Sequence, residues 1–473
     1  MAATNKPTRE KLAEYLADPN KFDCGIAIFN SNVMTKAYDI KKGRFCPPVR
    51  VSLFGKGWDK LFDDAEKAVS QPSEQPTSSS TSSEPSKLHF TIDIDQFPAF
   101  EPLLLDLSST KKLTVDNRLY IKQCTGKDYL SVKVNMHQPA KQNPESFLSK
   151  RISLVAPVTK ENITPKSSSM RILSGSTVAF CNKIPRSSQI RYMHFSSDGL
   201  LNLSVDNWSS FTICLVDENS AHGEEKDVKL KEGEINYGSI VKLLDRATCF
   251  WLPRMRIMNE IKGVIPLDQI IDQKKRVCEL QKSALQSLDN RYMSNQGNEI
   301  KKIYVTALND VMDEIEPSEK WAIMSIDETK YRFYEAMGPV SDPVTPVPTI
   351  IGIKPKKTAN SDGTPITLVE FTGSNFRKDH NIWFGLHELI QHSNEPNCIT
   401  CVLPTYDEVL RPREVSFSKT DSELNYPVTI TRNDGVIYGT SYYFLYNVGD
   451  GSCCAAMVNP LTEFIDPTRL RRI

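Results

Sequence analysis

The segment KKGRFCPPVR, residues 41–50, places four basic side chains around a Phe-Cys-Pro-Pro sequence. Two consecutive prolines cannot continue a helix, and they fit a central strand badly. The segment is therefore predicted to be a loop or a strand edge that is held out from the body of the protein. Its cations are Lys41, Lys42, Arg44 and Arg50, and they raise the question of which anion they meet.

Short β-rich runs separated by turn residues surround this segment. Before them, residues 7–17 are predicted to form a short helix, with Thr8 as its cap and Leu12, Tyr15 and Leu16 as its apolar stripe. The predicted strands of this first region are IAIFN (26–30), VRVSLF (49–54), LHFTIDI (88–94), NRLYI (117–121) and LSVKVNM (130–136).

Residues 70–86 consist entirely of Ser, Thr, Pro, Glu and Gln. This composition cannot bury enough apolar surface to form a core. Because the segment lies between predicted strands, we expect a disordered loop inside a domain, extending over about 66–88. A linker between domains is the alternative.

The central region repeats itself weakly, which favours a β-trefoil or a similar closed sheet. SGSTVAFCNK (174–183) is similar to YGSIVKLLDR (237–246), and WSSFTICLVDE (208–218) is similar to WAIMSIDE (321–328). Within it, residues 265–291 are predicted to be an inserted helix, from the spacing of Ile270, Ile271, Val277 and Leu280.

The last part of the chain begins with a proline-rich stretch at 338–353 that is typical of an extended, rigid linker. Alternating strands then predict an immunoglobulin-type sandwich. Asn433, Asp434 and Gly435 carry the signature of a tight hairpin turn.

The composition is that of an ordinary globular protein with several domains. The 473 residues are too many for one core, and 39% are hydrophobic and 25% charged. No apolar run is long enough to span a bilayer, and the N-terminus lacks a signal-peptide core. We therefore expect a cytosolic or nuclear protein that does not bind membranes. Eleven irregularly spaced cysteines predict free thiols, including Cys398, Cys401, Cys453 and Cys454.

The net charge is zero, yet the charges are unevenly distributed. The balance is +5 over residues 1–60, +7 over 141–193 and −4 over 217–234. Such a pattern is compatible with a polyanion on one face and a different partner on another, but the charge distribution alone favours a solvated surface.

No sequence motif of an enzyme or a metal site is present. There is no Gly-rich phosphate loop, GxSxG or HExxH, and His387 and His392 are five residues apart, which puts them on different faces of a helix. We predict no catalytic residue, no metal and no cofactor.

At FCPPVRVSLFGKGW (45–58) the sequence resembles the Suppressor of Hairless family, the DNA-binding transcription factors of the Notch pathway, also called CSL proteins. That family carries FFCPPPCVYL followed by G-x-GW. The resemblance continues at PTREKLAEYL (7–16), FLSKRI (147–152), YGSIVKL (237–243), YRFYEAMGPVSDPVTPVP (331–348), TGSNF (372–376) and RNDGVIYGTS (432–441).

The resemblance implies a mainly β protein in three domains. These are a Rel-homology-like sandwich (1–166), a β-trefoil (167–336) and, after the linker at 337–350, a Rel-like immunoglobulin (TIG) sandwich (351–450) followed by a tail (451–473). Family members read a GTGGGAA-like duplex with the first two domains, as monomers. They exchange corepressors for the Notch intracellular domain and a Mastermind-like coactivator, in the nucleus and cytoplasm.

The resemblance also implies a set of functional residues. In the family, the segment before FCPP is a hairpin in the major groove, where basic residues meet phosphates and guanine edges. The corresponding DNA-contacting residues here are Lys41, Lys42, Arg44, Phe45, Lys150, Arg151, Lys160, Lys166, Lys183, Arg186, Ser187, Gln189 and Arg191. The Notch-binding pocket corresponds to Val228, Leu230 and Trp251.

The sequence departs from the family pattern where DNA would be read. The family has YGNEKRFFCPPP where this chain has YDIKKGRFCPPV (38–49), so the base-reading Arg aligns with Gly43 and Arg44 replaces a Phe. A residue moved by one along a strand points to the other face. The lysine-rich SKPSKKKQS aligns with APVTKENIT (156–164), in which only Lys160 is basic.

The partner pocket is altered as well. A small residue of the family's MALP aligns with Trp251 in FWLP (250–253), and we expect its indole to lie in the core. Two functions follow: a divergent sequence-specific transcription regulator, or an interaction scaffold that kept the fold and lost specific DNA reading.

Overall fold

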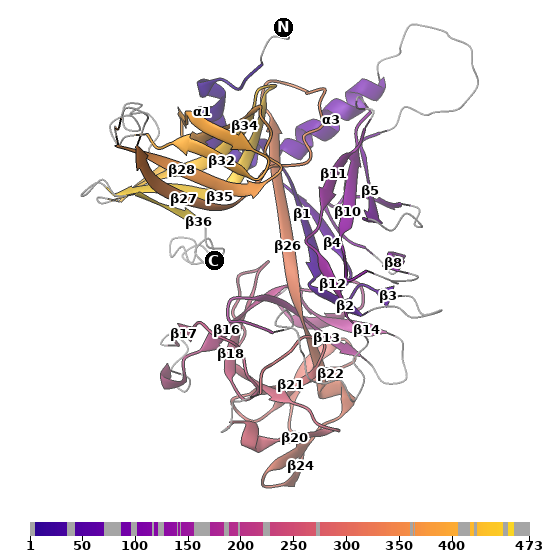
Figure 1. The fold of residues 1–473 in the computed structure, drawn as a ribbon. Helices are drawn as coiled ribbons and strands as arrows, with labels where there is room; N and C mark the ends of the chain where they lie inside the picture. Colours follow the sequence, from indigo (N-terminus) through magenta and orange to yellow (C-terminus); the bar gives the residue numbers. More distant parts are fainter. Residues whose placement is uncertain are drawn as a thin grey trace.

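The computed structural model is mainly β, as predicted, with three domains in the expected order (Figure 1). It describes the chain except for residues 1–4, 36–42, 71–86, 96–101, 116–117, 122–126, 140, 142, 156–170, 184–188, 197–198, 221–227, 271–274, 360–362, 364, 405–416, 421–422, 448–452 and 458–473. The predicted disordered loop over about 66–88 lies outside the described residues at 71–86, whereas residues 66–70 form the end of helix α3 (Gly57–Ser70), so the prediction is wrong there.

The N-terminal domain is a Rel-homology-like sandwich. Its central strand β1 pairs antiparallel with β4, and Ile26 and Ile28 of β1 and Val51 and Leu53 of β4 are buried in the same core as Trp58. Helix α3 covers this core through apolar positions three or four residues apart, a helix that the sequence analysis did not predict. The elements are β1 (Cys24–Ser31), β2 (Val33–Thr35), β3 (Gly43–Arg44), β4 (Arg50–Phe54), α3 (Gly57–Ser70), β5 (His89–Ile94), β6 (Leu103–Leu105), β7 (Lys112–Thr114), β8 (Tyr120–Ile121), β9 (Tyr129–Leu130), β10 (Val132–His137), β11 (Glu145–Leu148) and β12 (Ile152–Val155).

The central domain is a β-trefoil with its own core. Apolar side chains from strands throughout the domain, among them Phe180, Phe211, Leu243 and Trp321, fill this core. Its strands are β13 (Thr177–Lys183), β14 (Ile190–Phe195), β15 (Leu201–Ser204), β16 (Phe211–Val216), β17 (Leu230–Lys231), β18 (Ile240–Asp245), β19 (Met255–Asn259), β20 (Val264–Pro266), β21 (Lys282–Ser287), β22 (Tyr292–Gln296), β23 (Glu299–Ile303), β24 (Thr306–Asn309) and β25 (Met312–Glu314).

The prediction of an inserted helix over 265–291 is wrong. The described part of this segment holds β20, a short 3-10 turn at Leu267–Ile270 and β21. Val277 is fully buried in the trefoil core, and Leu280 has a positive φ of 65° that no α-helix contains. The helical spacing of the apolar residues was accidental, because tertiary packing in the trefoil uses them as strand and turn positions.

The C-terminal domain is the predicted immunoglobulin-type sandwich of two sheets. β34 and β35 are joined at Asn433–Gly435, which confirms the hairpin turn. One sheet contains β27 (Thr349–Ala359), β28 (Pro365–Ser374), β31 (Gln391–Glu395) and β32 (Cys398–Val402), and the other contains β29 (His380–Phe384), β30 (His387–Glu388), β33 (Phe417–Thr420), β34 (Glu423–Arg432), β35 (Val436–Asn447) and β36 (Cys453–Met457).

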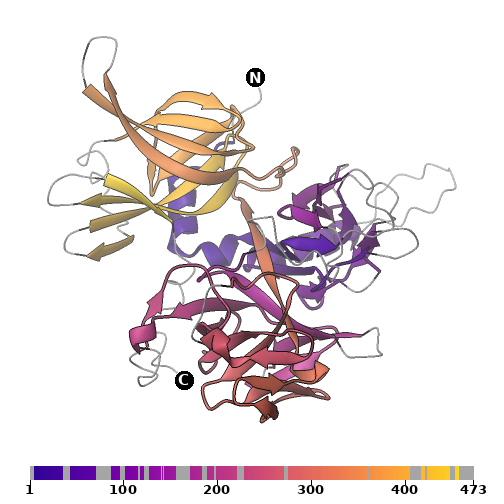
Figure 2. The same cartoon turned by 60° about the horizontal axis from the view of Figure 1, so that its bottom comes forward.

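A single strand, β26 (Trp321–Glu335), runs through all three domains (Figures 1 and 2). Its first residues pair with β13 and β21 of the trefoil. Its middle pairs with β1 from Ser31↔Ile326 to Cys24↔Phe333, and its end pairs with β35 of the C-terminal domain. The relative position of the domains is therefore fixed by main-chain hydrogen bonds.

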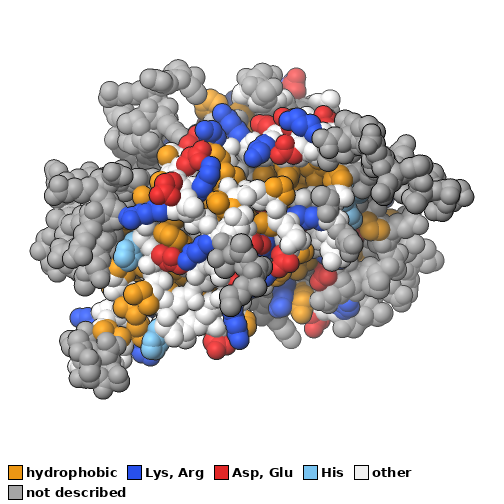
Figure 3. Space-filling view, turned by 90° about the horizontal axis from the view of Figure 1, so that it is seen from above, with side chains coloured by type: hydrophobic (Ala, Val, Ile, Leu, Met, Phe, Trp, Pro, Cys, Tyr) orange, Lys and Arg blue, Asp and Glu red, His pale blue; other side chains and the backbone are white. Residues whose placement is uncertain are grey.

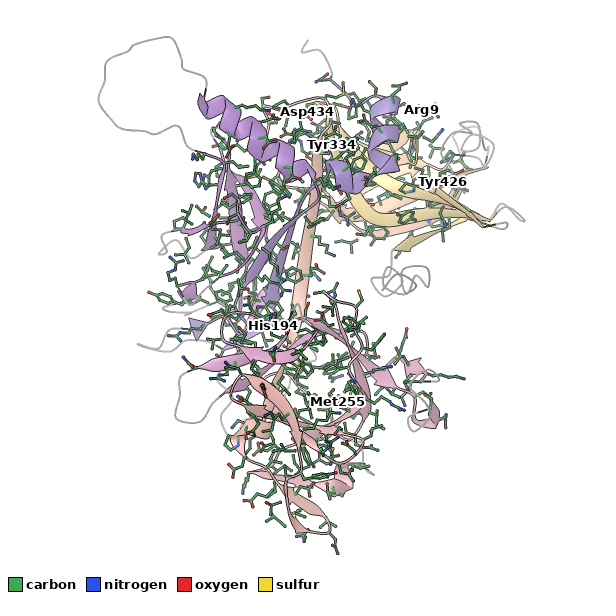
Figure 4. The ribbon with its side chains drawn as sticks, turned by 180° about the vertical axis from the view of Figure 1, so that it is seen from behind. Arg9, His194, Met255, Tyr334, Tyr426 and Asp434 are labelled. Carbon is green, nitrogen blue, oxygen red and sulfur yellow. The ribbon has the colours of Figure 1, made fainter. Side chains whose placement is uncertain are left out.

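Helix α1 (Arg9–Ala17) also attaches the C-terminal sandwich to the N-terminal part of the chain. The predicted first helix is confirmed as α1, capped by Thr8, and its apolar face packs on Trp383 and Ile437. Figure 4 shows Tyr334 at the end of β26 near this helix, and its ring stacks on that of Tyr15.

The proline-rich segment after β26 is clamped between two domains. The Glu145 carboxylate of β11 accepts hydrogen bonds from the backbone N–H groups of Val344 and Thr345, each at 3.0 Å. The Arg432 guanidinium of β34 donates to the carbonyls of Pro343 and Asp342 at 2.6 and 3.1 Å. These contacts hold the segment at both sides.

Candidate nucleic-acid interface

The basic segment at 41–50 contains a short strand, β3, that presents Arg44 to solvent. Gly43 pairs with Ile121 and is buried, whereas Arg44 pairs with Tyr120 and is exposed. Successive residues of a strand point to opposite faces. The one-residue shift relative to the family pattern therefore leaves an arginine, not a glycine, on the outer face.

Phe45 does not lie at this surface. It is only 5% exposed and belongs to the core of the N-terminal domain. A buried side chain cannot reach a duplex, so Phe45 is removed from the predicted DNA contacts. Its role is to anchor the basic segment beside Val49 and Ile121.

Three of the other predicted cations make contacts within the protein. The Lys150 ammonium lies 3.2 Å from the Asp327 carboxylate, and the Arg151 guanidinium lies 4.4 Å from the centre of the Tyr129 ring. Arg191 donates to Gly297 and Asn298 in the turn between β22 and β23. Lys150 and Arg151 remain exposed, and Gln189 is exposed beside β14.

The remaining predicted DNA contacts lie outside the described residues, or only their backbone is described. Lys183 is the last residue of β13, and only its backbone is described. The others are Lys41, Lys42, Lys160, Lys166, Arg186 and Ser187.

The N-terminal domain and the trefoil meet around Arg50, which sequence reasoning counted only among the cations of the basic segment. Its guanidinium carbon lies 4.4 Å from the centre of the Phe29 ring and 4.0 Å from that of Trp208. Trp208 in turn donates its indole N–H to the carbonyl of Pro48 at 3.0 Å. The signal in the sequence is an arginine inside the apolar run VRVSLF, where only a paired or stacked cation is tolerated.

Other ionisable groups lie at the same junction, among them His194, which is labelled in Figure 4. Partial desolvation of the ammonium group, followed by the charge of Arg50, lowers the pKa of Lys112, although the residue as a whole is exposed. Burial, followed by the charge of Lys112, lowers the pKa of His194. Asp245 is fully buried and accepts two hydrogen bonds from Thr248. The junction is thus a partly desolvated polar layer between two apolar cores.

A sulfur pair lies at the edge of this junction, directly behind β3. The thiol of Cys46 lies 3.9 Å from that of Cys181 on β13, and the Tyr192 hydroxyl lies 3.6 Å from the Cys46 sulfur. Cys46 follows Arg44 by two residues, and Cys181 precedes Lys183 by two. The two segments predicted to face DNA are therefore adjacent in space at their bases.

The predicted partner pocket lies on another face of the trefoil. Val228 packs against buried Val216 and Ile240, while Leu230 pairs with Val216 across β16 and β17. Leu230 is 45% exposed.

Trp251 is not a core residue, so that expectation is wrong. It is 38% exposed, and its backbone bridges Leu244 at the end of β18. The Lys242 ammonium lies 5.2 Å from its ring centre. The indole lies on the outside of the sheet because the inner face of β18 is already filled by Val241 and Leu243.

Charges elsewhere on the molecule are mixed. On the face shown in Figure 3, blue and red side chains alternate among the described residues, and orange patches lie between them. In the described part of the chain, no group of three or more His, Cys, Asp or Glu side chains could hold a metal ion. No helix among the described residues is both long and apolar enough to cross a bilayer.

Three family models match the chain in succession. The model described as "LAG1, DNA binding" matches residues 26–169, the "Beta-trefoil DNA-binding domain" matches 197–316, and the "TIG domain" matches 347–446. Each match falls on one of the three folds described above.

Two curated proteins are similar over most of the chain. The human "Recombining binding protein suppressor of hairless-like protein" is 24% identical over 444 residues, which cover 89% of this chain and 79% of that protein. The mouse protein of the same name is 24% identical over 437 residues, with the same coverage.

These matches, together with the three-domain fold, assign a non-enzymatic, DNA-binding role in transcription, which is a nuclear role. The chain belongs to the Suppressor of Hairless (CSL) family of DNA-binding transcription factors.

Proposed function

We propose that the protein, as a monomer, recognises a GTGGGAA-like duplex site and regulates genes transcribed by RNA polymerase II. The observation that carries this proposal is the exposure of Arg44 on β3, close to the end of β13. The Cys46–Cys181 contact at 3.9 Å keeps these two segments together. One segment comes from each domain, so both can contact one stretch of duplex.

Arg44 is the residue suited to read a base. Its guanidinium can donate two parallel hydrogen bonds to the edge of a guanine, which a lysine ammonium cannot reproduce. Lys150 and Arg151 lie exposed on the same domain and suit phosphate contacts, which position a protein without reading sequence.

The test is a gel shift of the purified chain with the GTGGGAA duplex and with a scrambled duplex of equal length. Selective retardation of the first supports the proposal. Equal binding of both, or binding of neither, would instead favour an interaction scaffold that kept the fold without specific reading.

A second part of the proposal concerns partners. We infer that the trefoil surface formed by Val228, Leu230 and Trp251 accepts an apolar segment of a Notch intracellular domain, in exchange for a corepressor, and that a Mastermind-like coactivator joins that complex. The support is the exposure of Leu230 and Trp251 on one side of the β16–β17–β18 sheet. Trp251 covers space that a small residue would leave open, so we expect weaker peptide binding than in relatives.

Calorimetry with a Notch juxtamembrane peptide tests this surface. Leu230→Ala should weaken binding, because it removes apolar contact area, and Trp251→Ala should strengthen it. If neither change alters the affinity, the peptide does not bind at this surface.

A further inference from the structure

Two thiols from different domains face each other behind the candidate DNA-reading strand. Cys46 lies between β3 and β4 of the N-terminal domain, and Cys181 lies on β13 of the trefoil. Their sulfur atoms are 3.9 Å apart. A disulfide bond requires about 2 Å, so the sulfurs must approach by a further ~2 Å.

The surroundings decide which side moves. Asn182, next to Cys181, donates to the carbonyls of Pro317, Ser318 and Lys320, and it accepts a hydrogen bond from Asn295. These contacts fix the end of β13. The approach must therefore come from Cys46, which lies outside any strand and is only half-buried.

The chemistry of Cys46 also differs from that of its neighbours. A hydrogen bond from the Cys181 thiol holds the pKa of Cys46 below its ordinary value. Burial acts in the opposite direction, and a hydrogen bond from the Tyr192 hydroxyl adds to the lowering. By contrast, burial raises the pKa of Cys214 and Cys278, and it raises that of Cys401 to about 12. A thiolate is the nucleophilic form of cysteine, so Cys46 is the thiol of this pair that reacts first.

We propose that Cys46 and Cys181 are a site of reversible oxidation, at which a peroxide converts the two thiols into a disulfide between the N-terminal domain and the trefoil. The Cys46 sulfur attacks one oxygen of hydrogen peroxide, the O–O bond breaks, and a sulfenic acid and one water form. The Cys181 sulfur then attacks the Cys46 sulfur, an S–S bond forms, and the sulfenic oxygen leaves as a second water. The two sulfurs lose two electrons, which reduce the peroxide.

The bond would change the protein in two ways. It would join two residues that are 135 positions apart in the sequence. Such a cross-link restricts the unfolded chain and thereby stabilises the folded state. It would also join the base of the Arg44 segment covalently to β13, so that this segment could no longer shift relative to that strand.

Peptide mapping tests the proposal without any reference to DNA. The full chain is treated with hydrogen peroxide, the remaining thiols are alkylated, and the digest is searched for a peptide pair joined through Cys46 and Cys181, lighter by two hydrogen atoms. A thiol reductant should separate the pair again. The matched control is Cys214→Ser, since Cys214 is also buried in the trefoil, and it should leave the cross-link unchanged.

Either Cys46→Ser or Cys181→Ser should abolish the cross-link, and the oxidised wild type should melt at a higher temperature than the reduced protein. If a serine is not tolerated at the buried position, Cys181→Ala serves instead. Peroxide that modifies exposed Cys249 without joining Cys46 to Cys181 would overturn the proposal. If the cross-link forms in a protein that does not select the GTGGGAA duplex, the disulfide proposal is supported and only the proposed function is refuted.

Discussion

Arg50 and Trp208 join the N-terminal domain to the trefoil by two contacts at once. The Arg50 guanidinium donates to the Trp208 carbonyl at 2.8 Å, and its central carbon lies 4.0 Å from the centre of the indole ring. Burial lowers the pKa of Arg50 to about 10, so the side chain stays charged at neutral pH. The interface therefore depends on a cation that is stabilised by aromatic rings and a carbonyl.

We expect Arg50→Ala to lower the free energy of unfolding by about 2–4 kcal/mol, because a desolvated cation–π contact, a hydrogen bond and the packing of the stem are lost together. Arg50→Met keeps much of the volume without the charge and should cost less. Urea denaturation of both variants measures the difference. Losses below about 0.5 kcal/mol for Arg50→Ala would contradict this account.

The contact of α1 with the C-terminal sandwich predicts a non-additive pair of substitutions. A Cβ added at Gly439 would lie 2.5 Å from the Tyr15 hydroxyl oxygen, with every other atom at least 3.5 Å away. Gly439→Ala should therefore cost about 1–3 kcal/mol of stability. In a Tyr15→Phe background, which removes that oxygen, the same substitution should cost clearly less.

A double-mutant cycle by thermal or urea unfolding measures this coupling. Tyr15→Phe alone also removes the hydrogen bond to Asp23 at 2.8 Å, and the cycle corrects for that loss. If Gly439→Ala lowers the free energy of unfolding equally in both backgrounds, the added methyl group does not clash with the Tyr15 hydroxyl.

Glu279 predicts a pH dependence of stability. Burial raises the pKa of Glu279 to about 7, and the Ser325 N–H donates to its carboxyl at 3.1 Å. Between about pH 4.5 and 7 the folded state holds a proton that the unfolded state has released, so stability falls as the pH rises through this window, by up to about 3 kcal/mol.

Glu279→Gln removes this titration, and the variant should unfold with a flatter pH profile and be more stable than wild type above pH 7. Burial also raises the pKa of Asp23 to about 6, so the comparison is the difference between variant and wild type at each pH. Parallel profiles from pH 5 to 8 would show that Glu279 does not titrate there.

Two tryptophans of the trefoil, Trp251 and Trp321, should respond differently to truncation. Trp251→Ala should cost less than about 1.5 kcal/mol, because the ring is partly solvated. Trp321 is fully buried and donates its indole N–H to the Met293 carbonyl at 2.8 Å, so Trp321→Ala should cost about 3–5 kcal/mol. Equal losses in denaturant unfolding would mean that Trp251 packs inside.

Arg44→Ala tests base reading. On the GTGGGAA duplex it should cost about 1–3 kcal/mol of binding free energy, and on a scrambled duplex much less. Lys160→Ala, the matched control for a phosphate contact, should weaken both duplexes alike and reduce the slope of log affinity against log salt by about 0.9. Titrations at two salt concentrations separate these effects. Equal weakening by Arg44→Ala would make it a phosphate contact.

Local patterns were sufficient to predict much of the fold. The strand runs and the hairpin at Asn433–Gly435 depend on alternation and turn chemistry, which act over a few residues. The helix predicted at 265–291 failed because Val277 is held by distant trefoil strands, and such packing overrides spacing. Helix α3 was missed although Trp58, Leu61, Phe62 and Ala65 carry helical spacing.

The candidate site was predictable in part for a related reason. The exposure of Arg44 follows from strand alternation once β3 is in place. Three features could not be predicted: the burial of Phe45, the exposure of Trp251 and the stacking of Arg50. Each depends on which distant strands pack against the residue, and the sequence near the residue does not contain that information.

The path of β26 has a consequence for how the molecule opens. Residues 322–325 of β26 pair with β13 of the trefoil, residues 326–333 with β1 and residues 334–335 with β35, so each domain holds its own stretch of the strand. The backbone amides of β26 should therefore exchange with deuterium stretch by stretch, each as its pairing with one domain opens. A gene fragment that ends at either side of residues 321–335 would leave one domain with an uncovered sheet edge, and such fragments should aggregate when expressed alone.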